Sequence, residues 1–276
     1  MKSARLLSIL SFLALCIHIG FSYLTQFKLV NTSTVGEISD KYPSLFTPAG
    51  ITFAIWGVIY ISLIAFSIYH ILLAWTRPEN HSGNIDQQKI GGWFIFNNLA
   101  AAAWLIAWTR EMILLSVFLI FFQLLSLIII NMRLCIYDRK RSAIAKLFTQ
   151  FPLSIYFAWI TIATIANTSS YLNALGWNPI MHEITWTVLM ITIAVLITVL
   201  VVMSRRNVLY GLVVIWALFG IVLKRMSVDE IQYFEIIRAA WIGISIISVV
   251  CALQFARNLI SRKSRPIFPL SPHPVK

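Results

Sequence analysis

Long apolar segments constrain this chain more than any other feature of its sequence. A transmembrane helix needs about 20 mostly apolar residues, and hydrophobic residues make up 59% of this chain while charged residues make up 12%. That charged share is about half of the share usual in soluble proteins, so the chain lacks the polar surface to cover a globule. Eight segments of suitable length lie at about 6–24, 50–75, 90–108, 111–131, 147–167, 184–203, 207–223 and 233–256. We therefore predict an all-α polytopic membrane protein.

The two ends of the chain differ from the spans between them. Lys2 and Arg5 precede the first apolar segment, as in a signal peptide. No small-x-small cleavage pattern follows residues 16–19, so we predict a retained helix. The last residues, 261–276, are basic and rich in proline. We predict that they form a cytoplasmic tail that touches anionic lipid, which makes membrane lipids one expected partner.

Basic residues are distributed unevenly between the two sides of the predicted spans. Lys and Arg number 22 against 10 Asp and Glu, an excess that in a soluble chain indicates nucleic acid binding. Here the basic residues lie between apolar segments, as topology signals do, so we expect no nucleic-acid partner. With both termini in the cytoplasm, 16 of the 22 basic residues fall on the inner side. The other six would lie outside: Lys28, Lys41, Arg110, Lys224, Arg225 and Arg238.

Motifs for catalysis and metal binding are missing from the sequence. Cys16, Cys135 and Cys251 are far apart and belong to no CxxC pair or Cys/His cluster. No HExxH, P-loop or GxSxG pattern occurs, and the acidic residues lie at span ends or in loops. His18 and His70 fall inside spans, but at depths of about 18 Å and about 9 Å from the inner surface, which argues against a shared haem. We predict no catalytic residue, metal site or cofactor, and we assign no enzymatic activity.

Aromatic and polar residues recur at helical spacing in three of the predicted spans. Residues three, four or seven apart share one face of an α-helix. In each span this face carries a tryptophan about 9–12 Å below the outer end of the helix. The three faces comprise Phe53, Trp56 and Tyr60; Asn97, Trp104 and Trp108; and Tyr156, Trp159, Ala163 and Asn167.

These faces allow more than one interpretation. Trp and Tyr form belts at the headgroup level of membranes, but Trp56, Trp104 and Trp159 lie deeper than a belt usually reaches. The three indoles therefore fit a common pocket. Plain helix packing explains the same spacing, and the small residues 100–103 suit a closely packed neighbouring or partner helix. The spacing alone leaves both interpretations open.

Two stretches resemble signature motifs of the TspO/MBR family, the tryptophan-rich sensory proteins related to the mitochondrial translocator protein. The stretch 46–60 (FTPAGITFAIWGVIY) has the family's Thr-Pro followed by Phe, Trp and Tyr, at Thr47, Pro48, Phe53, Trp56 and Tyr60. The stretch 156–167 (YFAWITIATIAN) resembles the family's Y-x-x-W-x-x-x-A-T-x-x-N, and Leu-Asn follows at 172–173. Two positions depart from the pattern: Ala101 lies where the family usually has asparagine, and Ile155 where it has proline.

The resemblance implies an architecture and a function. It implies a five-helix unit over 1–175, three additional transmembrane helices over 176–260 and the tail 261–276. It further implies a bacterial inner-membrane protein, favours a homodimer, and implies an outer-leaflet pocket for a flat lipophilic ligand such as a porphyrin or sterol. Thr47 and Pro48 would form a lid, and the three aromatic faces would bind the ligand.

The function predicted from this resemblance is that of a membrane sensor or carrier. A secondary transporter of a small lipophilic solute is the alternative, although the sequence reveals no inverted repeat, broken central helix or buried charge pair. A membrane assembly factor without a small ligand is the other alternative, in which the helix faces bind only a partner helix.

Arg238 lies about one turn inside the last predicted span, near the outer surface and three residues after Glu235. Its side chain can extend to the interface and pair with Glu235. It can also bind a ligand carboxylate, which would adapt the additional helices to acidic ligands.

Overall fold

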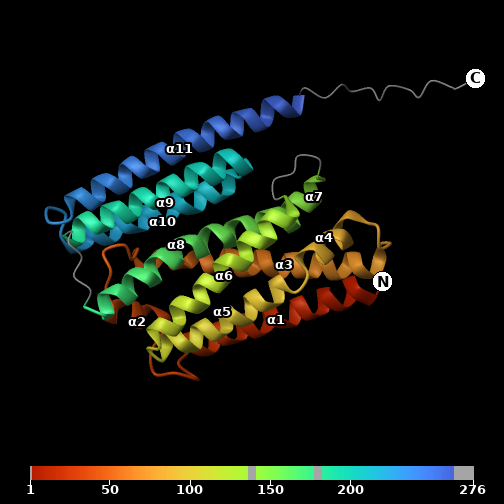
Figure 1. The fold of residues 1–276 in the computed structure, drawn as a ribbon, viewed down its shortest axis with the longest axis horizontal. Helices are drawn as coiled ribbons and strands as arrows, with labels where there is room; N and C mark the ends of the chain where they lie inside the picture. Colours follow the sequence, from red (N-terminus) through yellow and green to blue (C-terminus); the bar gives the residue numbers. More distant parts are fainter. Residues whose placement is uncertain (1, 136–140, 177–181, 264–276) are drawn as a thin grey trace, which may run out of the picture.

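The computed structural model describes residues 2–135, 141–176 and 182–263, and these residues form an all-α bundle without strands (Figure 1). Each predicted span coincides with a long helix. The long helices are α1 (Lys2–Gln26), α3 (Ile55–Thr76), α5 (Trp93–Thr109), α6 (Ile113–Leu134), α8 (Phe151–Ala174), α9 (Glu183–Arg205), α10 (Val208–Val228) and α11 (Phe234–Lys263). Seven helical segments of the described chain are long and apolar enough to span a membrane, or eight when a bent pair is counted as one span. The predicted all-α membrane fold is therefore confirmed.

Five short elements connect the long helices, and none of them was expected from hydrophobicity. They are α2 (Val35–Lys41), the 3₁₀-helix η1 (Gly50–Ala54), α4 (Ser82–Ile90), α7 (Ala143–Ala145) and the π-helix η2 (Lys146–Gln150). Helix α2 is polar and begins with a capping box, in which the Thr34 side chain and the Glu37 side chain each accept the other residue's backbone N–H. That pattern satisfies two otherwise unpaired donors and stabilises a helix of only two turns.

The long helices run alongside one another in two groups (Figure 1). Helices α1, α3, α5, α6 and α8 form the first group, and α9, α10 and α11 lie together on the side of α8. Helix α11 ends at the same end of the bundle at which α1 begins. We call this end the N-terminal end and the opposite end, which carries α2 and η1, the loop end.

The two groups share one continuous apolar core. Helix α10 packs on α8 and on η1. The Asn207 amide donates to Ser154 Oγ over 3.0 Å, and the Phe157 and Tyr210 rings lie 5.1 Å apart. The boundary predicted between 1–175 and 176–260 therefore does not interrupt the core, and the division into these units stays a prediction.

The charged residues fit the predicted topology. The six basic residues expected outside lie at or near the loop end, while Arg5, Arg77, Arg133 and Arg206 lie toward the N-terminal end. Which end faces the cytoplasm stays a prediction. Arg139, Lys140 and residues 264–276, which include Arg265 and Lys276 of the predicted tail, lie outside the described residues.

The structure corrects the expectation that no broken helix or buried charge pair exists. Helices α4 and α5 together are long and apolar enough to form one membrane span, which is bent by 50° between them. Asp86 of α4 is ion-paired with Arg141, and the two side chains are only 5% and 13% exposed. The sequence did not indicate this pair, because α4 is short and polar. Helix α4 is buried through its packing against α1, α3 and α6.

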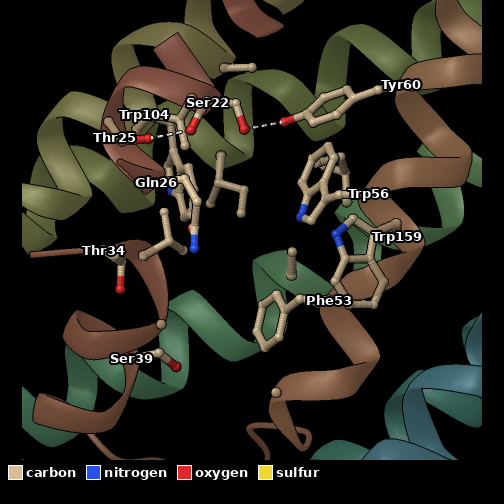
Figure 2. A pocket seen from close by; sticks show the side chains of 18 of the residues that line it. Ser22, Thr25, Gln26, Thr34, Ser39, Phe53, Trp56, Tyr60, Trp104 and Trp159 are labelled. Atoms are coloured by element: carbon tan, nitrogen blue, oxygen red, sulfur yellow. Dashed lines mark hydrogen bonds between the residues drawn. The ribbon is translucent and has the colours of Figure 1, made fainter. Parts of the chain in front are cut away.

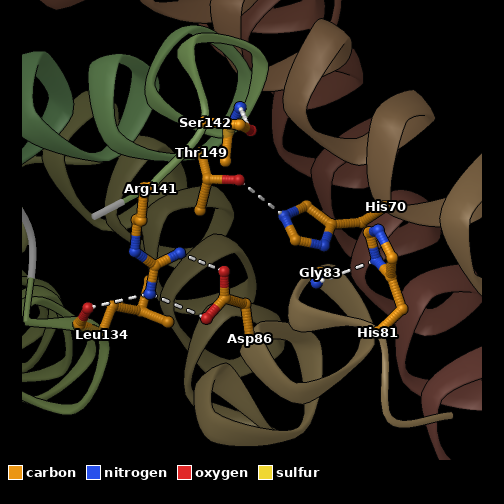
Figure 3. Close-up of polar contacts among 9 residues, drawn as sticks. His70, His81, Gly83, Asp86, Leu134, Arg141, Ser142 and Thr149 are labelled. Atoms are coloured by element: carbon orange, nitrogen blue, oxygen red, sulfur yellow. Dashed lines mark hydrogen bonds and ion pairs between the residues drawn. The ribbon is translucent and has the colours of Figure 1, made fainter. Parts of the chain in front are cut away.

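The Asp86–Arg141 pair joins three parts of the N-terminal end (Figure 3). One guanidinium nitrogen of Arg141 donates to Asp86 Oδ1 over 2.8 Å and to the Leu134 carbonyl over 3.0 Å. Close by, His70 is hydrogen-bonded to Thr149 of η2 over 3.1 Å. The bonds of Arg141 hold α4 against the end of α6 and the segment before α7, and the His70 bond holds α3 against η2.

We expect Asp86→Ala to destabilise the fold, because it leaves the buried Arg141 cation without its partner. Loss of one member of a buried pair costs about 3–5 kcal/mol, and the double variant Asp86→Ala/Arg141→Met should recover part of that loss. Thermal unfolding in detergent measures the effect. Asp40→Ala, which breaks an exposed pair with Lys224, serves as the control with little expected change. Equal stability of the Asp86→Ala variant and the wild type would contradict this role.

Candidate functional site

A cavity of about 490 Å³ lies near the loop end, between α1, α2, η1, α3, α5, α6, α8 and α10. Its volume falls within the range of about 300–1,000 Å³ that is typical of pockets for small molecules. In Figure 2, side chains of α1 and α5 lie on one side of the open space, and side chains of η1, α3 and α8 lie on the other.

The first aromatic wall follows from the local sequence around Pro48. Pro48 lacks a backbone donor and fixes its own φ, so the chain turns before η1 and presents Phe53 to the cavity. Helix α3 begins at Ile55, and its face carries Trp56 and Tyr60, whose rings are stacked with centroids 5.2 Å apart.

Trp159 of α8 completes this wall. Its ring meets Phe53 edge-on at 5.8 Å and Trp56 edge-on at 6.3 Å. The side chain is 2% exposed, and its indole N–H has no hydrogen-bond partner in the structure. Figure 2 shows the indole nitrogens of Trp56 and Trp159 turned toward each other beside the open space. The wall therefore offers ring faces and at least one free donor.

Trp104 of α5 lies on the opposite wall and is held from behind. Its indole N–H donates to Asn167 Oδ1 over 2.8 Å, and the Asn167 amide donates to Ser116 Oγ over 3.0 Å. The ring stacks on Trp108 at 5.7 Å, and Trp108 donates to the Val35 carbonyl of α2 over 3.1 Å. Asn167 and Trp108 thus position Trp104 and α2 and do not themselves line the cavity.

The structure brings most of the predicted ligand-binding residues together. The cavity wall includes Thr47, Pro48, Phe53, Trp56, Tyr60, Trp104, Trp159 and Ala163. Ala101, the position at which the chain departs from the TspO/MBR pattern, also lines it.

Five predicted residues lie elsewhere. Asn97 donates to the Gln123 carbonyl and to Ser126 Oγ of α6, over 3.0 and 2.7 Å. Tyr156 is fully buried behind Trp56, with ring centroids 6.1 Å apart. Trp108 and Asn167 lie behind Trp104, as described above. These four residues support the wall from outside the cavity.

Arg238, the fifth, lines a separate groove along α11, together with Phe234 and Trp241. Its guanidinium carbon lies 5.8 Å from the centre of the Phe234 ring. Within the described chain no ion pair joins Arg238 to Glu235. The structure therefore does not bring this arginine to the aromatic cavity.

Sequence reasoning missed the polar wall of the cavity. His18, Ser22 and Thr25 of α1 line it, and their spacing of four and three residues places them on one helical face. The Tyr60 hydroxyl donates to Ser22 Oγ over 3.0 Å, and the His18 ring is hydrogen-bonded to Asn98 over 3.1 Å. That periodicity was readable in the sequence, although isolated polar residues inside an apolar span give a weak signal.

Residues from α2 and α10 also line the cavity and were not predicted. Helix α2 contributes Ser39 and Asp40, and α10 contributes Lys224. The capping box at Thr34 could have revealed α2. No local pattern links Lys224 to the aromatic motifs, because the contact joins segments far apart in the sequence.

Charged groups outside the spans hold α2 over the loop end. Glu111, between α5 and α6, accepts hydrogen bonds from Lys41 Nζ over 2.7 and 2.6 Å and from the Tyr42 hydroxyl over 2.7 Å. These bonds lower the pKa of the Glu111 carboxyl and raise the pKa of Lys41. Hydrogen bonding to Lys28 likewise lowers the pKa of Glu37. Helix α2 is therefore attached to the bundle by ionised carboxylates.

This architecture defines a class: a polytopic, all-α membrane protein with an aromatic-walled cavity near one end of its bundle. The comparison with protein families makes the class specific, since the family model described as TSPO-like protein matches residues 8–253. The chain therefore belongs to the TSPO-like protein family, and the resemblance found in the two motifs is confirmed. The match includes α9, α10 and most of α11. No curated protein and no solved structure matches the chain.

We predict that acidification loosens α2. Because the pKa of Glu111 is lowered in the fold, its stabilising effect is complete above the ordinary carboxyl pKa and is lost as pH falls through the lowered value. A spin label at Ser39 should become more mobile over that range. In Glu111→Gln the label should be mobile already at neutral pH, with the remaining pH response due to Glu37. Identical pH profiles for both proteins would contradict the attachment.

We also predict that Asn167→Ala destabilises the site, because it leaves the Trp104 indole donor unpaired. An unpaired buried donor costs about 1–3 kcal/mol, and thermal unfolding in detergent measures it. Asn131→Ala is the matched control, since among the described residues the Asn131 side chain bonds to the Leu127 carbonyl of its own helix. Equal unfolding temperatures for the two variants would contradict the positioning role of Asn167.

Proposed function

We propose that this protein binds a flat lipophilic ligand, a tetrapyrrole or a sterol-like molecule, in the aromatic cavity and acts as a membrane sensor or carrier. One observation carries the proposal: Trp56, Trp104 and Trp159, from three different helices, line a single cavity of about 490 Å³. Indole faces stack favourably on planar rings, and a mostly apolar wall with a few polar groups is typical of small-molecule sites. Membership of the TSPO-like family supports lipophilic ligands.

The short elements at the loop end would control access to the ligand. Thr47 and Pro48 line the cavity directly before η1, and α2 supplies Ser39 and Asp40. Helix α2 is attached through Glu111, through the Trp108 bond to Val35, and through Ile38, which is buried against Trp108 and Ile113. An element this short, held by a small number of contacts, is suited to open locally. We infer that α2 and the Thr47–Pro48 segment together form the lid.

The charge distribution supports a definite orientation. Basic residues are concentrated on cytoplasmic loops of membrane proteins, and here they favour the N-terminal end. We infer a bacterial inner-membrane protein with both termini in the cytoplasm, in which case the cavity opens toward the outer leaflet.

A secondary transporter is the second candidate function, and the N-terminal end of the bundle supports it. Ionisable pairs and broken helices at membrane depth are common in transport pathways. Here the Asp86–Arg141 pair is buried, and a bend of 50° between α4 and α5 interrupts one candidate span. They lie at the end opposite the aromatic cavity, so a pathway between them would cross the bundle.

Binding is tested by titrating the detergent-purified protein with protoporphyrin IX and following tryptophan fluorescence. The wild type should show saturable quenching, and Trp56→Phe/Trp159→Phe should lose affinity because two stacking faces are smaller. Trp75→Phe/Trp241→Phe removes two exposed tryptophans outside the cavity and should bind like the wild type.

Three results would contradict the proposed site. They are non-saturable quenching of the wild type, unchanged affinity in the Trp56→Phe/Trp159→Phe variant, and equal losses in both double variants. Failure of binding together with accumulation of a lipophilic solute in proteoliposomes that contain the wild type, and not in protein-free liposomes, would favour the transporter.

A further inference from the structure

Helix α10 contacts the cavity lid directly. The Ala49 backbone N–H donates to the Gly220 carbonyl over 2.9 Å, and the Trp216 indole N–H donates to the Thr52 carbonyl over 2.9 Å. A Cβ atom at position 220 would overlap the side chains of Thr52 and Pro48. Glycine at this position therefore permits α10 to approach the Thr47–Pro48 segment closely. This part of the additional helices belongs to the site's own wall.

One helical turn after Gly220, Lys224 reaches the cavity. Its ammonium lies 3.1 Å from Asp40 Oδ1 of α2. The described residues that line the cavity include one aspartate, Asp40, and one lysine, Lys224. They include no glutamate or arginine. The neighbouring charges of α2, Glu37 and Lys41, are already paired with Lys28 and Glu111.

The two members of this pair differ in how firmly they are held. The Asp40 side chain is 72% exposed and lies on the two-turn helix α2, whereas Lys224 is 30% exposed and lies on the long helix α10. An ion pair with so exposed a partner contributes little net stability, because water and salt screen it. Asp40 can therefore leave at small cost while Lys224 stays at the cavity.

The unpaired polar atoms of the wall point to the same kind of ligand. Trp159 and Thr47 line the cavity, and their buried Nε1 and Oγ1 atoms have no hydrogen-bond partner. The indole nitrogen is a donor only, and the hydroxyl is a donor as well as an acceptor. A ligand with acceptor atoms would satisfy them, and an acidic group supplies acceptors together with the charge that Lys224 attracts.

We propose that Lys224 binds the carboxylate of an acidic lipophilic ligand, and that this carboxylate replaces Asp40 as the counter-ion. This inference rests on the proposed function, since the flat part of the same ligand would lie between the tryptophans. A carboxylate is favoured over a phosphate because a single lysine neutralises one negative charge. Lys224, and not Arg238, is the cation that the additional helices bring to the cavity.

The test compares protoporphyrin IX with its dimethyl ester, which has the same ring but no carboxylate. In Lys224→Gln, affinity for the acid should fall about tenfold, the scale of one charge-assisted bond, while affinity for the ester stays unchanged. Lys224→Arg should restore binding of the acid. Asp40→Asn should strengthen binding of the acid, because the competing counter-ion is removed. Added salt should weaken binding of the acid only.

Arg238→Gln is the matched control, since Arg238 is another cation of the additional helices near the loop end and lines a separate groove. Unchanged affinity of Lys224→Gln for the acid, or equal losses for acid and ester, would overturn the assignment of Lys224 and leave the proposed function standing. If neither probe binds saturably to the wild type, the tetrapyrrole part of the proposed function is overturned, and this inference with it.

Discussion

Hydrogen bonds between helices hold this bundle in a defined arrangement. Lipid tails are as apolar as leucine, so there is no hydrophobic driving force for helices to associate within a membrane. Interhelical hydrogen bonds therefore help to determine which helices pack together. Asn97 joins α5 to α6, Asn167 joins α8 to α5 and α6, and Asn207 joins the start of α10 to α8. The placement of the aromatic walls depends on these asparagines.

The cavity lies where this internal pairing is incomplete. Behind Trp104 the indole donor is satisfied by Asn167, whereas the donor of Trp159 is buried and free. In a low-dielectric setting an unpaired donor is costly, and a ligand acceptor would remove that cost. Trp159, which packs among the helices around the cavity, thus offers a hydrogen-bond donor to a polar atom of an otherwise apolar ligand.

Most of the fold could be predicted from the sequence, because apolar length is a local property. Each predicted span became a helix, whereas α2 and α4 were missed because they are short and polar. The aromatic motifs indicated Trp56 and Trp159 correctly as neighbours. Periodicity could not separate Trp104, which faces the cavity, from Asn97, which faces α6, because a helix surrounded by others has several buried faces. The contact of Lys224 with Asp40 could not be predicted from the sequence, because it depends on how α10 packs against the rest of the bundle.

The central claim is that the three deep tryptophans enclose a ligand. The most direct measurement is a structure of the protein with zinc protoporphyrin IX, in which anomalous scattering locates the metal independently of the ring density. We predict a zinc peak inside the cavity, between Trp104 on one side and Trp56 and Trp159 on the other. A peak found only in the groove beside Arg238, or only on the outer surface of the helices, would contradict the account.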